Sequence, residues 1–182
     1  TASSSQNNQV PDPVKDAAEV LAQMSAIEAR TPQELLAIAN AKALTGDYTG
    51  ALSFYRDVYK SPNYTLSDDD LGKFAGVIGL NGDAELFNQL SESLRLNGKD
   101  SSITPIVLSF EAGLKSALQA NLYNGRFDES IRLGRIYFAR NAGQPDAWAH
   151  LWMACALGQK HAAICAIDDK DVSLKVLCAE AA

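Results

Sequence analysis

Long apolar runs and histidines are scarce in this sequence. No apolar stretch approaches the roughly 18 residues that a bilayer-spanning helix needs, so we expect no transmembrane segment. The two histidines are His150 and His161, and no serine stands in a nucleophile-elbow setting. The acidic run at residues 68–70 lacks the glycine turn and closing glutamate of a calcium loop. We therefore expect a protein that is not an enzyme and has neither a cofactor nor a metal site.

Cysteine is also rare and confined to one end of the chain. The three cysteines are Cys155, Cys165 and Cys178, and none forms the Cys-x-x-Cys pair or has the histidine spacing of a zinc site. A disulfide between Cys165 and Cys178 would close the polar turn at residues 168–171 in an oxidising compartment. Free cysteines packed as small apolar side chains fit the sequence equally well.

Proline, glycine and β-branched residues are few, whereas alanine and leucine dominate. This balance favours helices over strands. A chain of 182 residues with 47% hydrophobic side chains is long enough to bury a core. Its net charge of −6 would repel phosphate backbones, so we expect an acidic, soluble, all-α protein that does not bind nucleic acid.

Residues 1–12 are mostly polar and contain Pro11 just before Pro13, which predicts a flexible linker before a single domain at residues 13–182. The linker and the C-terminal cysteines fit an exported, periplasmic protein, although a cytoplasmic location also agrees with the sequence. Apolar residues at three- and four-residue steps predict a helix over 13–29. Thr31, Pro32 and Glu34 then form a capping-box signature that opens a second helix ending near Thr45.

The stretch from Gly46 to Pro62 carries a glycine turn, an aromatic residue, a small residue and a proline stop. Together with Leu35, Ile38 and Ala39 in the preceding helix, this order resembles a tetratricopeptide repeat. Glycine allows the left-handed turn between two antiparallel helices, and small side chains let the helices approach each other. The resembling unit spans residues 31–62.

Weaker copies of the pattern follow at residues 67–97, 105–141 and 145–167, with turn glycines at Gly82, Gly125 and Gly158. Phe87 stands where the second unit should have a small residue, so we expect that unit to pack more loosely or at another angle. Residues 168–182 would cap the last apolar face. The resemblance implies a right-handed superhelix of antiparallel helix pairs, with an N-terminal helix and a C-terminal capping helix.

In this family the first helices of successive repeats line a groove that binds peptides or helices. The resemblance implies a groove lined by Gln33, Leu36, Asn40 and Leu44 in the first unit and by Lys115, Gln119 and Tyr123 in the third. Amides, a cation and an aromatic ring suit an extended polypeptide. We therefore expect a scaffold or adaptor for a partner protein. Small acidic repeat proteins behind a polar linker resemble components of bacterial envelope and secretion assemblies.

A second hypothesis is a structural subunit of an obligate oligomer. Its contact would be the apolar C-terminal region around Trp148, Trp152 and Met153. Light scattering separates the two hypotheses, because an adaptor should be monomeric by itself.

Glycines at residues 72, 76, 79 and 82 share nearly one stripe of a predicted helix. Each costs about 1 kcal/mol relative to alanine in a helix interior, so some other interaction should compensate. Close approach of a neighbouring helix is one explanation, and an inserted partner segment is another. The aspartates at 68–70 stand at the start of this helix, where negative charge complements the exposed N–H groups.

Overall fold

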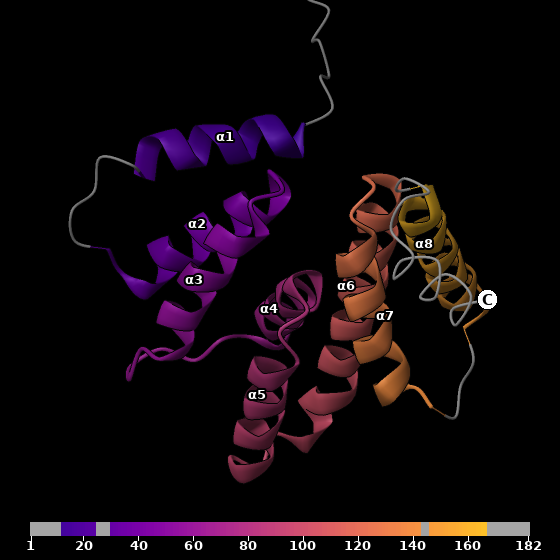
Figure 1. Ribbon diagram of the computed structural model, residues 1–182. Helices are drawn as coiled ribbons and strands as arrows, with labels where there is room; N and C mark the ends of the chain where they lie inside the picture. The colour runs from indigo at the N-terminus through magenta and orange to yellow at the C-terminus, as the bar shows by residue number, and fades with distance from the viewer. Residues whose placement is uncertain (1–11, 25–29, 143–145, 167–182) are drawn as a thin grey trace, which may run out of the picture. The chain divides into compact units, whose positions relative to one another are not determined.

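The computed structural model describes residues 12–24, 30–142 and 146–166. All regular secondary structure in these ranges is helical. They contain eight α-helices and one short 3-10 helix, without a strand (Figure 1). The all-α prediction is confirmed. The predicted linker and the predicted C-terminal cap lie outside the described residues, apart from Asp12. The chain divides into two compact units, residues 1–67 and 68–182, which we describe separately.

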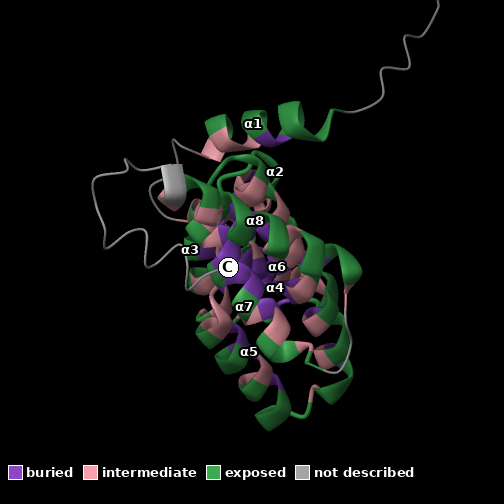
Figure 2. Ribbon diagram, turned by 45° about the vertical axis from the view of Figure 1, so that its right-hand side comes forward, coloured by how far each residue is buried: buried purple, intermediate pink, exposed green. Residues whose placement is uncertain are grey.

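The first unit contains α1 (Pro13–Met24), α2 (Pro32–Leu44) and α3 (Tyr48–Tyr59). The predicted capping box at the start of α2 is present. The backbone N–H of Thr31 donates to Glu34 Oε2 over 2.7 Å, and the N–H of Glu34 donates to Thr31 Oγ1 over 3.3 Å. Helix α1 packs on α2 and is largely exposed, with Ala17 buried (Figure 2).

Helices α2 and α3 form the helical hairpin that the clearest repeat unit predicts. Ala39 of α2 and Ala51 of α3 are completely buried, as expected for the small residues that allow two helices to pack closely. Gly46 between them has a positive φ of 85°. The buried Tyr55 donates its hydroxyl to Asn40 Oδ1 over 2.5 Å. This partly buried hydrogen bond links α3 to α2.

The second unit contains five α-helices in its described part: α4 (Asp68–Asn81), α5 (Ala84–Leu96), α6 (Ile103–Tyr123), α7 (Phe127–Arg140) and α8 (Ala147–Ala166). A 3-10 turn, Asp100–Ser102, precedes α6. Helix α6 has 21 residues and is the longest of the described helices. Ser130 of α7 is buried and donates to the Leu118 carbonyl over 3.0 Å, so its hydroxyl is paired inside the unit.

Helix α4 packs chiefly against α6 rather than against α5, its neighbour in sequence. Phe87 of α5 is fully buried, and its ring stacks on Phe110 of α6 with the ring centroids 4.0 Å apart. The Arg140 guanidinium of α7 lies 4.6 Å from the Phe87 centroid. These contacts hold α5 against α6 and α7, in agreement with the looser α4–α5 pairing predicted from Phe87.

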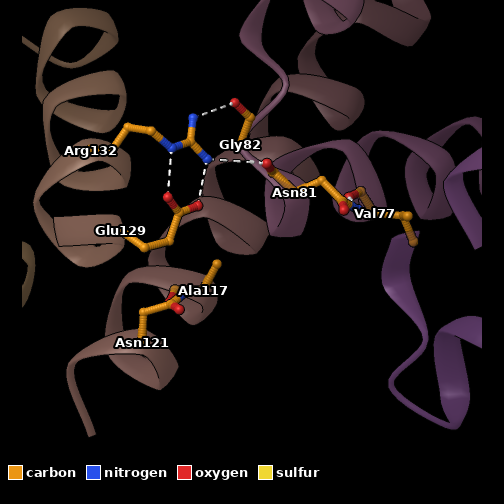
Figure 3. A network of polar contacts seen from close by, with 7 residues as sticks. All are labelled: Val77, Asn81, Gly82, Ala117, Asn121, Glu129 and Arg132. Carbon is orange, nitrogen blue, oxygen red and sulfur yellow. Dashed lines mark hydrogen bonds and ion pairs between the residues drawn. The ribbon is translucent and has the colours of Figure 1, made fainter. Parts of the chain in front are cut away.

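Arg132 of α7 fastens the turn between α4 and α5 (Figure 3). Its guanidinium donates to the Gly82 carbonyl over 3.2 Å and to the Asn81 carbonyl over 3.3 Å. Glu129 holds the same guanidinium through contacts of 2.6 and 2.8 Å. Carbonyl groups at a helix C-terminus lack partners within the helix, so Arg132 supplies donors where α4 ends.

The turn predicted at Gly158 is wrong. Helix α8 runs without interruption from Ala147 to Ala166, so Gly158 lies inside a helix and does not separate two of them. By contrast, Gly46, Gly82 and Gly125 all have positive φ at helix ends. The residues after Gly158 include Gln159, Lys160 and several alanines, which are good helix formers. The described part of the fourth unit is therefore one long helix.

Candidate partner-binding site

An open groove lies between α4 and α6, with a cavity volume of about 700 Å³. Its lining is mostly small or acidic and includes Asp68, Asp69, Gly72, Gly76, Ser109, Ala112, Gly113 and Ser116. The two helices run in the same direction, because Ser102 before α6 donates to Asp68 at the start of α4 over 2.7 Å while Gly79 near the end of α4 faces Phe110. We call this feature the α4–α6 groove.

Two glycines bring the backbones of α4 and α6 together beneath the groove. A Cβ atom on Gly79 would lie 2.1 Å from the Phe110 carbonyl oxygen. A Cβ atom on Gly113 would lie 2.3 Å from the Gly76 carbonyl oxygen. Neither position has room for alanine unless the helices separate. Of the two explanations given for the glycine stripe, close approach of a neighbouring helix thus accounts for Gly79.

Gly72 and Gly76 are different, because the packing of the chain does not require glycine there. A Cβ atom on Gly72 would lie 3.5 Å from Ser109 Oγ, and one on Gly76 would lie 3.7 Å from the Ser109 carbonyl oxygen. Both are ordinary van der Waals distances. These two glycines leave backbone accessible along one wall of the groove, although alanine would be more favourable in a helix.

The end of the groove at the start of α4 is acidic. Lys73 Nζ lies 2.6 Å from Asp69 and 3.8 Å from Asp70, and the hydrogen bond with Asp69 is the main reason that the pKa of Lys73 is raised. Lys73 thus pairs with Asp69 and Asp70, while Asp68 accepts the hydrogen bond from Ser102. This excess of negative charge favours a basic group on any segment that enters the groove from this end.

The predicted binding residues of α2 divide into exposed and engaged ones. Gln33 and Leu44 are exposed, whereas Leu36 is buried and Asn40 accepts the Tyr55 hydrogen bond. Those of α6 lie in the second unit. Gln119 is half-buried and Tyr123 is 75% exposed.

Lys115, the cation of the predicted set, forms an ion pair with Asp146, which also caps the start of α8. This hydrogen bond is the main cause of the lowered pKa of Asp146 and of the raised pKa of Lys115. The hydroxyl of Tyr137 donates to the same carboxylate over 3.4 Å, and burial raises the pKa of Tyr137. Lys115 therefore joins α6 to α8, and a partner would have to compete with Asp146 for it.

The groove and part of the predicted set lie on one face of α6. Ser109, Ala112, Ser116, Gln119 and Tyr123 follow one another at three- and four-residue steps, which is the spacing of a single helix face. The face begins in the groove and continues to the exposed Tyr123. We call these five residues the α6 track. Sequence reasoning named Gln119 and Tyr123 of this face; the signal for the other three was the run of small residues at the same spacing.

The residues of the C-terminal aromatic region differ in exposure. Trp148 is 63% exposed, whereas Trp152 is half-buried and Met153 packs against Gly134 of α7. Sequence reasoning missed two other exposed apolar residues of α8: Leu151, 50% exposed, and Leu157, 46% exposed. Leu151 could have been found, because it lies three residues after Trp148 on the same helix face.

Cys155 is an exposed free thiol on α8. The predicted disulfide falls outside what the structure describes, since Cys178 and the side chain of Cys165 are not among the described positions. Within residues 12–24, 30–142 and 146–166, no group of three or more His, Cys, Asp or Glu side chains could hold a metal ion. None of the helices in these ranges is long and apolar enough to cross a membrane.

The geometry above can be set beside known proteins. No family model matches this sequence, and no curated protein or solved structure is detectably similar to it. The tetratricopeptide resemblance therefore depends on the residues of the chain itself and enters below as part of a proposal.

Proposed function

We propose that this chain is a non-catalytic scaffold or adaptor of tetratricopeptide-like helix pairs that binds a peptide or helix of a partner protein. The observation that carries the proposal is the α4–α6 groove. Under the repeat pattern, α4 and α6 are the first helices of consecutive units, and these are the helices that line the binding groove in that family. A groove between them is the feature that such a function requires.

The chemistry of the groove supports a polypeptide ligand. Its small side chains and accessible glycine backbone allow a segment to lie close to both helices, while the α6 track adds an amide at Gln119 and an aromatic ring at Tyr123. The main-chain amides of an extended peptide need such donors and acceptors. A side chain of either an extended peptide or a helix can pack on the tyrosine ring. The acidic end at residues 68–70 selects a ligand with a basic residue at the matching end.

The test begins with affinity capture on the full chain from its native organism, followed by binding measurements with each purified candidate. Gly72→Leu should weaken binding of the true partner by about tenfold or more, because the new side chain occupies the groove. Asp69→Asn should weaken it less and make it less sensitive to salt. The matched control is Leu96→Gln, at a 79% exposed position on α5 that does not line the groove.

Circular dichroism and thermal melting check that each variant is folded. If every captured partner binds Gly72→Leu as tightly as the unmodified chain, the groove is not the binding site and the proposal is wrong. The structure also changes the choice of variants. Substituting Asn40 or Lys115 would disturb the bonds with Tyr55 and Asp146, so Gln119→Ala and Tyr123→Ala are the better probes of the α6 track.

A second candidate function is a structural subunit of an obligate oligomer that packs through α8. The exposure of Trp148, Leu151 and Leu157 favours it, because large apolar side chains grouped on one helix mark interaction surfaces. Light scattering on the full chain tests this candidate. Trp148→Asp is the informative variant, since Trp152 is half-buried and its substitution would also disturb the packing within the unit.

A further inference from the structure

Helix α8 has one side packed in the second unit and an opposite side that is exposed. Ala149 and Ala156 are completely buried on the packed side. The opposite side carries Trp148, Leu151, Cys155, Gly158 and Ala162, all of them exposed. These five residues alternate three- and four-residue steps, which is the seam spacing of helices that pair along their length. We call them the α8 seam.

The α8 seam has no formal charge. Lys160 is the one Asp, Glu, Lys or Arg residue in the sequence from 147 to 166, and it forms an ion pair with Asp128 of α7. The whole chain carries a net charge of −6, so two copies repel each other over most contacts. An uncharged seam is a surface on which two copies can meet without burying like charges. A charged partner would find no opposite charge there.

The side chains of the seam are also graded in size. Trp148 and Leu151 are bulky and lie in the N-terminal half, whereas Gly158 and Ala162 are small and lie in the C-terminal half. If two copies pair antiparallel about Cys155, Trp148 of each copy faces Ala162 of the other, and Leu151 lies between Gly158 and Ala162 of the other. Parallel pairing would instead place bulk against bulk and leave a gap at the small end.

Gly158 gives this arrangement independent support. A Cβ atom at this position would meet nothing within 4 Å, so the packing of its own unit does not require glycine. Glycine in a helix interior is less favourable than alanine. The Leu151 side chain from a second copy, seated beside Gly158, would use the space that the missing side chain leaves.

We propose that two copies of this chain associate through their α8 seams, antiparallel about a twofold axis at Cys155. Such an interface is isologous, and the graded seam is complementary to itself in this register. The two α8 helices also place the N-terminus of one near the C-terminus of the other, which is favourable for their dipoles. The inference rests on the second candidate function for the contact through α8 but specifies a reversible dimer in place of an obligate oligomer; it does not depend on the α4–α6 groove.

The size of the contact sets its strength. A helix of 20 residues is about 30 Å long. A contact between single helices falls at the lower end of interface sizes, below about 1,200 Å² in total. We therefore expect a dimer that dissociates on dilution, with a dissociation constant on the order of micromolar. The candidate function requires that copies of the chain associate through α8. The proposed register adds which residues of the two copies face each other.

The first experiment is sedimentation equilibrium of the full chain over a range of concentrations. We expect the mass to rise from monomer to dimer with concentration. Trp148→Asp should remain monomeric, whereas Leu96→Asp on α5 should behave like the unmodified chain. A monomer at every concentration would overturn both the candidate function and the inference. If that monomer also protects Cys155 from N-ethylmaleimide, another part of the chain covers the seam.

The second experiment tests the register by itself. A variant with Cys165→Ser and Cys178→Ser retains Cys155, and a bifunctional maleimide that spans about 8–10 Å, the separation of packed helices, should link two copies through it. Gly158→Leu should weaken the dimer by about tenfold or more, because its side chain fills the space assigned to Leu151 of the other copy. A dimer that neither cross-links at Cys155 nor weakens in Gly158→Leu contradicts the inference and leaves the candidate function standing.

Discussion

At the scale of single residues, the turn glycines are under unequal constraints. Gly82 and Gly125 both have positive φ, at 64° and 71°. A Cβ atom on Gly82 would lie 2.4 Å from Leu133 Cδ2 and 2.6 Å from Arg132 Nη2, whereas one on Gly125 would meet nothing within 4 Å. The two turns look alike in sequence, but the second is open and the first is covered by α7.

This difference predicts unequal costs for the same substitution. Gly125→Ala should lower the free energy of unfolding by about 1–2 kcal/mol, the cost of a left-handed conformation for an L-residue. Gly82→Ala should cost about 1 kcal/mol more than that, because its methyl group also displaces the ends of the Arg132 and Leu133 side chains. Urea denaturation of both variants measures the difference, and equal losses would show that α7 does not constrain this turn.

The Lys115–Asp146 pair predicts a dependence on pH. The pKa of Asp146 is held below its ordinary value of 3.8, so its contribution to folding is complete above about pH 4 and is lost as pH falls through the lower folded value. Asp146→Asn keeps a good N-cap but removes the charge. At neutral pH it should lower stability by about 1 kcal/mol or less.

That gap between Asp146→Asn and the unmodified chain should close at strongly acidic pH, where Asp146 is protonated in both states. Denaturant titrations at neutral and acidic pH measure it. Glu92→Gln is the control, because the contact between Glu92 and Arg95 is 3.8 Å long and exposed. A gap that stays constant with pH would mean that the charge of Asp146 does not contribute.

At the scale of helices, the pairing of α4 with α6 depends on two glycines. Gly113→Ala should lower the free energy of unfolding by about 3 kcal/mol or more, because its Cβ would lie 2.3 Å from the Gly76 carbonyl oxygen and force the helices apart. Gly76→Ala is the matched control on the facing helix. Its Cβ has 3.7 Å of clearance, so we expect a neutral or stabilising effect of up to about 1 kcal/mol. Thermal unfolding distinguishes the two outcomes.

At the scale of the whole molecule, the division into two compact units predicts separate responses to local damage. In the full chain, Gly113→Ala should increase amide hydrogen exchange across α4 and α6, whose packing it weakens. Exchange in α2 and α3 should change little, because their core is built on Ala39, Ala51 and Tyr55 within the first unit. An equal increase in both units would show that the chain unfolds as one cooperative body.

The sequence by itself determined the helices, most of their ends and three of the four predicted turns. These features depend on interactions within about four residues, such as the Thr31 capping box and the left-handed glycines, and a local pattern can encode them. The prediction failed at Gly158, where the same residue type lies inside a helix. Glycine permits a turn but does not enforce one when the residues that follow favour a helix.

The tertiary structure alone decided which surfaces are available. Lys115 and Asp146 are 31 residues apart, and Asn40 and Tyr55 are 15 apart, so no local pattern shows that each pair is bonded. The α4–α6 groove likewise depends on Gly79 packing against Phe110 and Gly113 packing against Gly76 across two helices. The α8 seam is exposed because α7 and α6 cover the other side of α8. Contacts between distant residues depend on how the helices pack, and helical periodicity records only that one face of each helix is apolar.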